Sequence, residues 1–118
     1  HSVASLKALI EKQFSAITKN YEFTFFCNAE PFLTNDDFLK STLQKAIKKI
    51  VNVDPEKSTS GGTSDARFIT KICPVIEFGL VGKTMHKTDE NVEINDIVNL
   101  TKIYNQFLSN YFGVKSID

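Results

Sequence analysis

The sequence predicts an α/β fold with its elements in the order α-β-α-β-α-β-α. Apolar residues recur at steps of three and four in long segments of this 118-residue chain, as is typical of amphipathic helices. Short runs rich in aromatic and β-branched residues lie between those segments and are typical of strands. Proline, glycine and asparagine mark breaks between the runs. This alternation favours a sheet covered by helices.

The amino-terminal segment predicts a helix over about residues 2–19 and a strand over residues 21–27. The apolar positions of the helix are Val3, Leu6, Ile10, Phe14 and Ile17. The strand run is aromatic and partly alternating, but a strand without a neighbour leaves its edges open. We therefore expect this end to be a remnant of a larger domain, and the chain from position 3 onward to come from the middle of a longer protein.

A break at Asn28–Pro31 predicts the boundary between two parts of the chain. Proline disfavours helical angles in the residue that precedes it. We therefore divide the chain into residues 1–29, the remnant of one domain, and residues 30–118, which belong to a second domain.

The next segment predicts a helix over about Asp36–Val51, with Asn35 or Thr34 as its N-cap. Acidic residues in its first turn complement the helix dipole. A turn and a short strand around Lys57–Thr59 then lead to a Gly-Gly loop.

That loop, within Ser58–Arg67, is the strongest candidate for a binding site, because it joins two glycines and small polar residues to the only arginine. A helix over Ser64–Ile72 would point unpaired N–H groups and its positive dipole end at the loop, which suits an anion. The guanidinium of Arg67 could hold a carboxylate or phosphate through two hydrogen bonds. The alternative to a binding loop is a flexible linker. A third possibility, Ser64 as a nucleophile, is disfavoured because Ser64 lacks the G-x-S-x-G setting.

The last third predicts a mostly buried strand over Val75–Leu80, a polar loop over Thr84–Asn91 and a long helix. Asn95 or Asp96 is expected to cap this helix, and Gly113 stands where a helix C-terminal glycine belongs.

His86, in the polar loop, is a candidate metal ligand or general base. A catalytic zinc takes three protein ligands and keeps one open position. The nearby carboxylates, Asp89 and Glu90, are adjacent residues, which rarely converge on one ion. The residues therefore predict one metal ligand at most, with an ordinary surface histidine as the alternative.

The composition is that of a soluble globular domain, with 42% hydrophobic residues, 24% charged residues and a formal net charge of zero. This balance argues against nucleic acid as a partner, and no apolar run approaches the roughly 20 residues needed to span a membrane. Cys27 and Cys73 lie far apart among apolar residues. We expect them to be reduced and buried, in a cytoplasmic protein.

Several of these motifs resemble one family. They are Glu30–Thr34, Ser60–Ile69, Val75–Gly79, Thr84–Lys87, Glu90–Val92 and the closing helix. Over about Val3–Phe112, the chain resembles the carboxy-terminal part of the zinc aminoacylase/carboxypeptidase family of co-catalytic metallohydrolases. The run Gly61–Phe68 is specific for the desuccinylase branch, whereas the histidine motif is shared more widely.

The resemblance implies that the parent enzyme hydrolyses N-succinyl-LL-2,6-diaminopimelate to succinate and LL-2,6-diaminopimelate, a step of bacterial lysine biosynthesis. It implies two zinc ions that share a bridging water, with cobalt as an alternative metal and His86 as a ligand of one ion. It also implies that Gly62, Thr63 and Arg67 contact the anionic part of this small-molecule substrate. The other ligands and the glutamate base precede this chain in the family, so no catalytic residue is expected within it.

The family builds its homodimer through an inserted α/β lid or dimerisation domain. The resemblance implies that residues 1–29 keep the last helix and strand of this domain and that residues 30–118 are the carboxy-terminal part of the catalytic domain. The isolated chain is therefore expected to be inactive and to pair with a second copy through the open strand edge. Gly82 departs from the resemblance, because the desuccinylase often has a substrate-contacting asparagine there. A related aminoacylase or peptidase, and a non-catalytic anion-binding or interaction module, remain as alternative functions.

Overall fold

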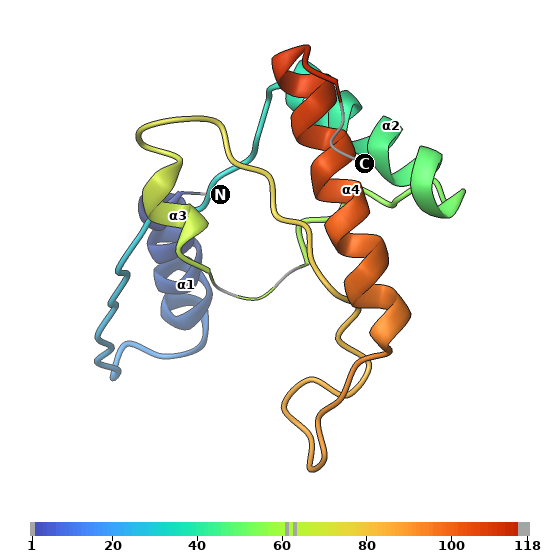
Figure 1. The fold of residues 1–118 in the computed structure, drawn as a ribbon. Coiled ribbons are helices and arrows are strands. Elements are labelled where there is room, and N and C mark those ends of the chain that lie inside the picture. The colour runs from blue at the N-terminus through green and yellow to red at the C-terminus, as the bar shows by residue number, and fades with distance from the viewer. Residues whose placement is uncertain (1, 61, 63, 116–118) are drawn as a thin grey trace. The chain divides into compact units, whose positions relative to one another are not determined.

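The computed structural model describes residues 2–60, 62 and 64–115. These residues contain four helices, shown in Figure 1: α1 (Val3–Ile17), α2 (Asp37–Val51), α3 (Ala66–Ile69) and α4 (Ile94–Phe112). No strand is assigned within the described ranges. The chain divides into two compact units. Unit 1 comprises residues 1–33 and 62–73, and unit 2 comprises residues 34–61 and 74–118.

Helix α1 in unit 1 begins with a reciprocal cap. The Ser2 hydroxyl accepts a hydrogen bond from the Ser5 backbone N–H at 3.1 Å, and the Ser5 hydroxyl accepts one from the Ser2 N–H at 2.9 Å. Two of the N–H groups that a helix start leaves unpaired are thereby satisfied. No residue of α1 is fully buried, so its apolar stripe is only partly covered within unit 1.

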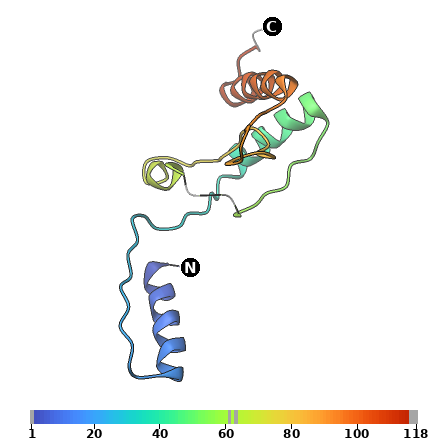
Figure 2. The same cartoon turned by 90° about the horizontal axis from the view of Figure 1, so that it is seen from below.

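The segment 21–30 returns beside α1, as Figure 2 shows. At its far end the carboxylate of Glu30 accepts a hydrogen bond from the Val3 N–H at 3.2 Å. Burial alternates along residues 21–26: Tyr21, Phe23 and Phe25 are half-buried, whereas the intervening side chains are exposed. Such a period of two is strand-like, but the backbone of residues 21–27 has no hydrogen-bonded partner strand in the described residues.

The core of unit 2 lies where α2 packs against α4. Its buried apolar side chains are Leu43, Ala46 and Ile47 from α2 and Ile103 from α4. Ala46 is 0% exposed, and its small side chain lets the two backbones approach closely. Aromatic contacts extend the interface, with the Phe38 and Tyr111 ring centroids 5.5 Å apart.

The segment 75–80 lies extended against this helix pair. Ile76 and Phe78 pack on the core, and the hydroxyl of Tyr104 donates a hydrogen bond to the Phe78 carbonyl. The hydroxyl of Thr34 donates to the carbonyl of Val75. The segment is half-buried rather than mostly buried, and Leu80 is exposed. Because a strand is defined by a hydrogen-bonded neighbour, the predicted α/β order stays a prediction.

The helix caps differ from the expected residues. Asp36, rather than Asn35 or Thr34, caps α2, and its carboxylate accepts a hydrogen bond from the Leu39 N–H at 2.8 Å. The Thr34 hydroxyl is already engaged by the Val75 carbonyl. Helix α4 starts one residue before Asn95, so Glu93 is its N-cap and makes no side-chain cap bond. The glycine prediction at the other end is confirmed, since Gly113 ends α4 with a φ of 66°.

Both cysteines are free, but they are exposed and not buried as expected. Cys27 ends the extended segment beside α1, and Cys73 lies just before Pro74. Neither residue contributes to the core between α2 and α4, which explains their exposure. No helix among the described residues has the length and apolar character needed to cross a bilayer.

An ion pair in the first turn of α2 joins the Lys40 ammonium to the Asp37 carboxylate at 2.7 Å. The hydrogen bond and the charge of Lys40 lower the pKa of Asp37, with a smaller effect from the charge of Lys57. The pair therefore contributes stability above the ordinary pKa of aspartate, and this contribution is lost as the pH falls through the lowered value. The contribution is small because Asp37 is fully exposed and its charge is screened by salt.

Replacing the N-cap of α2 tests its local contribution. Asp36→Ala removes the acceptor of the Leu39 N–H and is expected to lower the free energy of unfolding by about 1 kcal/mol. Asp36→Asn keeps an acceptor oxygen and should change it by only a few tenths of a kcal/mol. Urea denaturation followed by far-ultraviolet circular dichroism measures both variants. Equal losses in the two variants would contradict the cap assignment.

A second pair of substitutions tests the core. Ile47 is 3% exposed and Ile94 is 77% exposed. Ile47→Val leaves a methyl-sized void and should cost about 1 kcal/mol of unfolding free energy. Ile94→Val removes the same group from a solvated site and should cost less than about 0.5 kcal/mol. The same denaturation experiment compares them, and a larger loss at Ile94 would contradict the observed core.

Candidate functional site

The loop over residues 82–91 in unit 2 carries His86 and connects the segment 75–80 to α4. The Thr84 hydroxyl closes this loop through two hydrogen bonds to one residue. It donates to the Asn91 carbonyl at 2.8 Å and accepts from the Asn91 N–H at 2.9 Å. A side chain here takes the place of a backbone partner for Asn91.

His86 has a left-handed backbone conformation within this loop, with a φ of 61°. It lies in a turn closed by the Lys87 N–H, which donates to the Thr84 carbonyl at 3.0 Å. Its own N–H donates to the Glu90 carboxylate at 3.3 Å. A positive φ costs a residue with a side chain roughly 1–2 kcal/mol. Histidine enters this region more readily than most residues with a side chain. Because strained residues cluster at functional sites, the conformation keeps His86 a candidate for a functional role.

The imidazole of His86 is exposed and makes no hydrogen bond to the residues that the structure describes. Both ring nitrogens are therefore accessible to a metal ion. Within residues 2–60, 62 and 64–115, no three His, Cys, Asp or Glu side chains form a group that could hold a metal. Glu90 is engaged by the His86 backbone. The described residues therefore offer one accessible histidine without further metal-binding side chains grouped around it.

Arg67 lies in α3, in unit 1. Its guanidinium carbon is 4.8 Å from the centroid of the Phe68 ring, within the range of a cation–π contact. Its Nε is buried and has no hydrogen-bond partner in the described part of the chain. Buried donors without an acceptor are uncommon in folded proteins, so this atom marks Arg67 as a residue whose position calls for an explanation. Arg67 and His86 belong to different units, and each geometry holds within its own unit.

The expected helix over Ser64–Ile72 is wrong in length, because α3 spans only Ala66–Ile69. The residues after it form turns, with the Ile72 N–H donating to the Ile69 carbonyl at 2.8 Å. Pro74 then disfavours helical angles at Cys73. One helical turn sums few peptide dipoles, so a dipole-based anion site finds no support here.

The other residues of the predicted binding loop have different outcomes. The Ser64 hydroxyl accepts a hydrogen bond from the Ala66 N–H at 3.1 Å, which gives it a local structural role. Gly62 is exposed, and a Cβ built on it would meet no atom within 4 Å. Thr63 lies outside the described residues. Gly82 is different, because an added Cβ would lie 2.4 Å from the Met85 methyl carbon.

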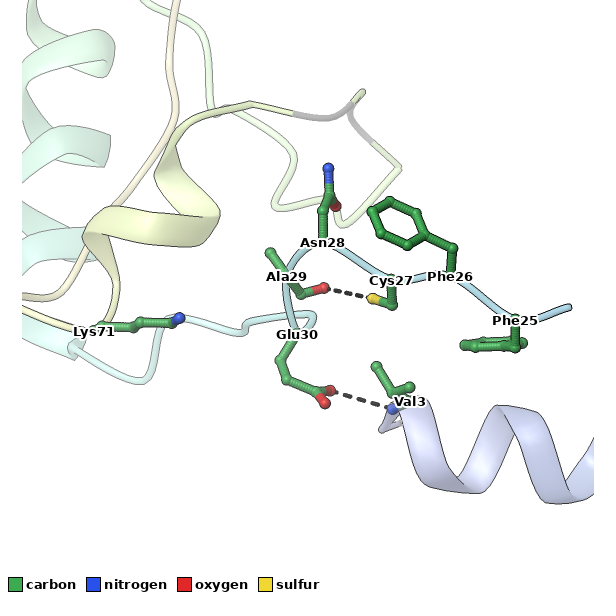
Figure 3. A pocket seen from close by; sticks show the side chains of 8 residues that line it. All are labelled: Val3, Phe25, Phe26, Cys27, Asn28, Ala29, Glu30 and Lys71. Carbon is green, nitrogen blue, oxygen red and sulfur yellow. Dashed lines mark hydrogen bonds between the residues drawn. The ribbon is translucent and has the colours of Figure 1, made fainter.

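A shallow hollow in unit 1 was not expected from the sequence. Figure 3 shows its lining residues, which include Cys27, Glu30 and Lys71. The Cys27 thiol donates a hydrogen bond to the Ala29 carbonyl at 2.9 Å, and Glu30 is paired with the Val3 N–H. These local contacts account for two of its polar side chains, so the hollow is a weaker candidate than the His86 loop.

Sequence reasoning also missed Thr84 and Asn91 as a pair. Their only signal is that they flank His86 in a polar segment. Hydroxyl and amide residues are common in loops, so composition does not reveal which of them pair.

Comparisons with known proteins add independent information. Three curated relatives are succinyl-diaminopimelate desuccinylases. The protein of Pelagibacter ubique is 51% identical over 116 residues, covering 95% of this chain and 30% of the relative. The protein of Wolbachia pipientis is 45% identical over 92% of this chain and 27% of the relative. The protein of Zymomonas mobilis is 42% identical over 96% of this chain and 30% of the relative.

The chain thus spans less than a third of the length of these relatives. The profile of peptidase family M20/M25/M40, an enzyme family that is generally metal-dependent, matches residues 4–110. This match covers the His86 loop and α3 together, and the chain belongs to peptidase family M20/M25/M40.

Proposed function

We propose that this chain is the carboxy-terminal part of a zinc-dependent amidohydrolase that cleaves N-succinyl-LL-2,6-diaminopimelate to succinate and LL-2,6-diaminopimelate. The observation that carries the proposal is the exposed imidazole of His86 on a strained, internally bonded loop. Membership of a generally metal-dependent family supports a metal as its ligand. The names of the three relatives support the choice of substrate.

His86 would hold one of two zinc ions through a neutral ring nitrogen, with cobalt as an alternative metal. The donor chemistry fits, because imidazole is a common zinc ligand and neither ring nitrogen is engaged within the described residues. When bound, zinc would polarise the amide carbonyl and activate a water molecule. The other ligands and the general base would come from the rest of the protein. This chain would thus contribute metal and substrate binding rather than the proton transfer.

Arg67 would bind the terminal carboxylate of the succinyl group. The terminal nitrogens of its guanidinium allow a two-pronged contact with a carboxylate. Packing against Phe68 restricts the guanidinium and reduces the entropy lost on binding. Gly62 and Thr63 would contact the same anionic end. The substrate is a small molecule, and the working protein would be a cytoplasmic homodimer.

Substituting Arg67 in the full-length enzyme tests the substrate. The unaltered enzyme should hydrolyse the N-succinyl compound, and Arg67→Ala should lower its kcat/KM roughly 10- to 100-fold because a charge-assisted contact is lost. Hydrolysis of the matched N-acetyl compound, which lacks the carboxylate, should change less than about threefold. Arg67→Lys keeps the charge without the fork and should give an intermediate value.

The outcome also separates this proposal from the related activities. An unaltered enzyme that prefers the N-acetyl compound, with Arg67→Ala leaving both rates unchanged, would identify an aminoacylase or peptidase instead. The isolated 118-residue chain supplied with zinc should show no turnover, since it offers one ligand from its described residues.

The open edge of residues 21–27 supports a prediction of self-association. The isolated chain should form a dimer by strand addition, because this segment has strand-like alternation without a partner strand in the described ranges. Thr24→Pro removes an edge N–H and should shift the chain toward the monomer, whereas Thr24→Val keeps the donor and should not. Light scattering over a range of concentrations measures the mass. A strictly monomeric unaltered chain would contradict this prediction.

A further inference from the structure

We infer that Thr84 is a positioning residue for His86: its hydroxyl closes the loop that holds the imidazole in place for a metal ion. This inference rests on the proposed function, because it takes His86 as a metal ligand. All residues in the argument belong to unit 2. Among the described residues the hydroxyl hydrogen-bonds only to the backbone of Asn91, so its effect on a metal would pass through His86.

The side chain of Thr84 joins the two ends of the His86 loop. The hydrogen bonds of Thr84 to Asn91 link residues seven positions apart. The other hydrogen bonds described in this loop are local. They join Met85 to Gly82, Lys87 to Thr84 and Lys83, His86 to Glu90, and Asn91 to Asp89. In the described residues, only the Thr84 hydroxyl ties the start of the loop to its end.

The backbone of the loop is strained between its joined ends. Between the two joined ends, His86 and Asp89 both have positive φ, at 61° and 57°. Residues with side chains are less stable in this region than at ordinary helical or extended angles, and histidine and aspartate tolerate it better than most. A loop released at its ends would relax toward ordinary angles and redirect the imidazole. Closure by Thr84 therefore opposes the relaxation that would move a metal ligand.

Further hydrogen bonds hold His86 and Asp89, the two residues with positive φ, to the end of the loop that Thr84 binds. The side-chain amide of Asn91 donates to the Asp89 carbonyl at 2.8 Å, and the neighbouring Glu90 accepts from the His86 N–H at 3.3 Å. Asn91 is thus held through its backbone by Thr84 while its side chain holds Asp89. Glu90 is the residue between Asp89 and Asn91 in the sequence. The Thr84 hydroxyl is thus linked to His86 through its hydrogen bonds to Asn91, the peptide bond between Asn91 and Glu90, and the hydrogen bond from the His86 N–H to Glu90.

Threonine suits this role because one hydroxyl both donates and accepts. Valine has nearly the same shape and can do neither, whereas serine keeps both functions. The pair Thr84→Val and Thr84→Ser therefore separates the hydrogen bonds from the packing of the side chain. His86→Ala provides the reference for loss of the ligand itself.

The test uses the full-length protein with these three substitutions. Zinc affinity is measured by competition with a chelator, and cobalt binding is followed by visible absorption. Thr84→Val is expected to weaken the affinity of one of the two bound metals roughly 10-fold, as is typical when groups that orient a ligand are removed. Thr84→Ser should stay within about threefold of the unaltered protein. His86→Ala should abolish tight binding of that metal.

A second readout is independent of metal and of activity. Amide hydrogen exchange in the metal-free protein should show protection at Asn91, and Thr84→Val should speed exchange there at least about 10-fold while Thr84→Ser retains protection. An Asn91 amide that exchanges freely in the unaltered protein would overturn the inference, even if the valine variant failed to fold.

The possible failures are distinguishable. If His86→Ala leaves both metals tightly bound, the proposed role of His86 as a ligand is wrong. If His86→Ala loses one metal while Thr84→Val releases the Asn91 amide and keeps full metal affinity, the proposed function stands and the positioning role of Thr84 is wrong.

Discussion

The packing of α2 against α4 is the constraint on which the described geometry of His86 depends. This contact buries Ala46 and Ile103 and provides the surface on which Ile76 and Phe78 pack. The Tyr104 hydroxyl then holds the Phe78 carbonyl. The chain enters the His86 loop just after this anchored segment and leaves it just before α4 begins. The core therefore anchors the chain on either side of the loop, and the Thr84 hydroxyl joins the ends of the loop itself.

A fixed base allows a loop to retain strain. The positive φ values of His86 and Asp89 would relax in a free peptide, but here the Thr84 hydroxyl and the Glu90 carboxylate oppose relaxation. A metal ligand benefits from such a hold, because less conformational freedom is lost on binding. Several ordinary hydrogen bonds together offset the free energy of this backbone strain. A polar, exposed loop can in this way present one side chain with a defined direction.

Arg67 in unit 1 is positioned in a different way from His86. Its helix is a single turn, so positioning comes from side-chain packing on Phe68 rather than from a long helix. The extended segment 21–27 in the same unit has alternating burial and no partner strand in the described residues. Segment 75–80 in unit 2 is covered by helices on one face. Each segment has the character of a strand whose partner strands the proposed whole enzyme would supply, so the α/β order remains a proposal for that enzyme.

The sequence by itself determined the three long helices to within a few residues, because their apolar spacing and end signals are local. Gly113 is an example, since only the backbone freedom of glycine makes the left-handed helix end inexpensive. It also singled out His86 and Arg67, whose chemistry is rare in this chain, and the family profile spans both.

Only the tertiary structure decided which polar groups meet. It placed Asp36 at the start of α2 because Thr34 is bonded to the distant Val75 carbonyl, and it joined Thr84 to Asn91 across the His86 loop. It also left the cysteines exposed, away from the core that their apolar neighbours had suggested. These outcomes depend on which individual side chains meet in the folded chain, and such contacts leave no periodic pattern in a sequence.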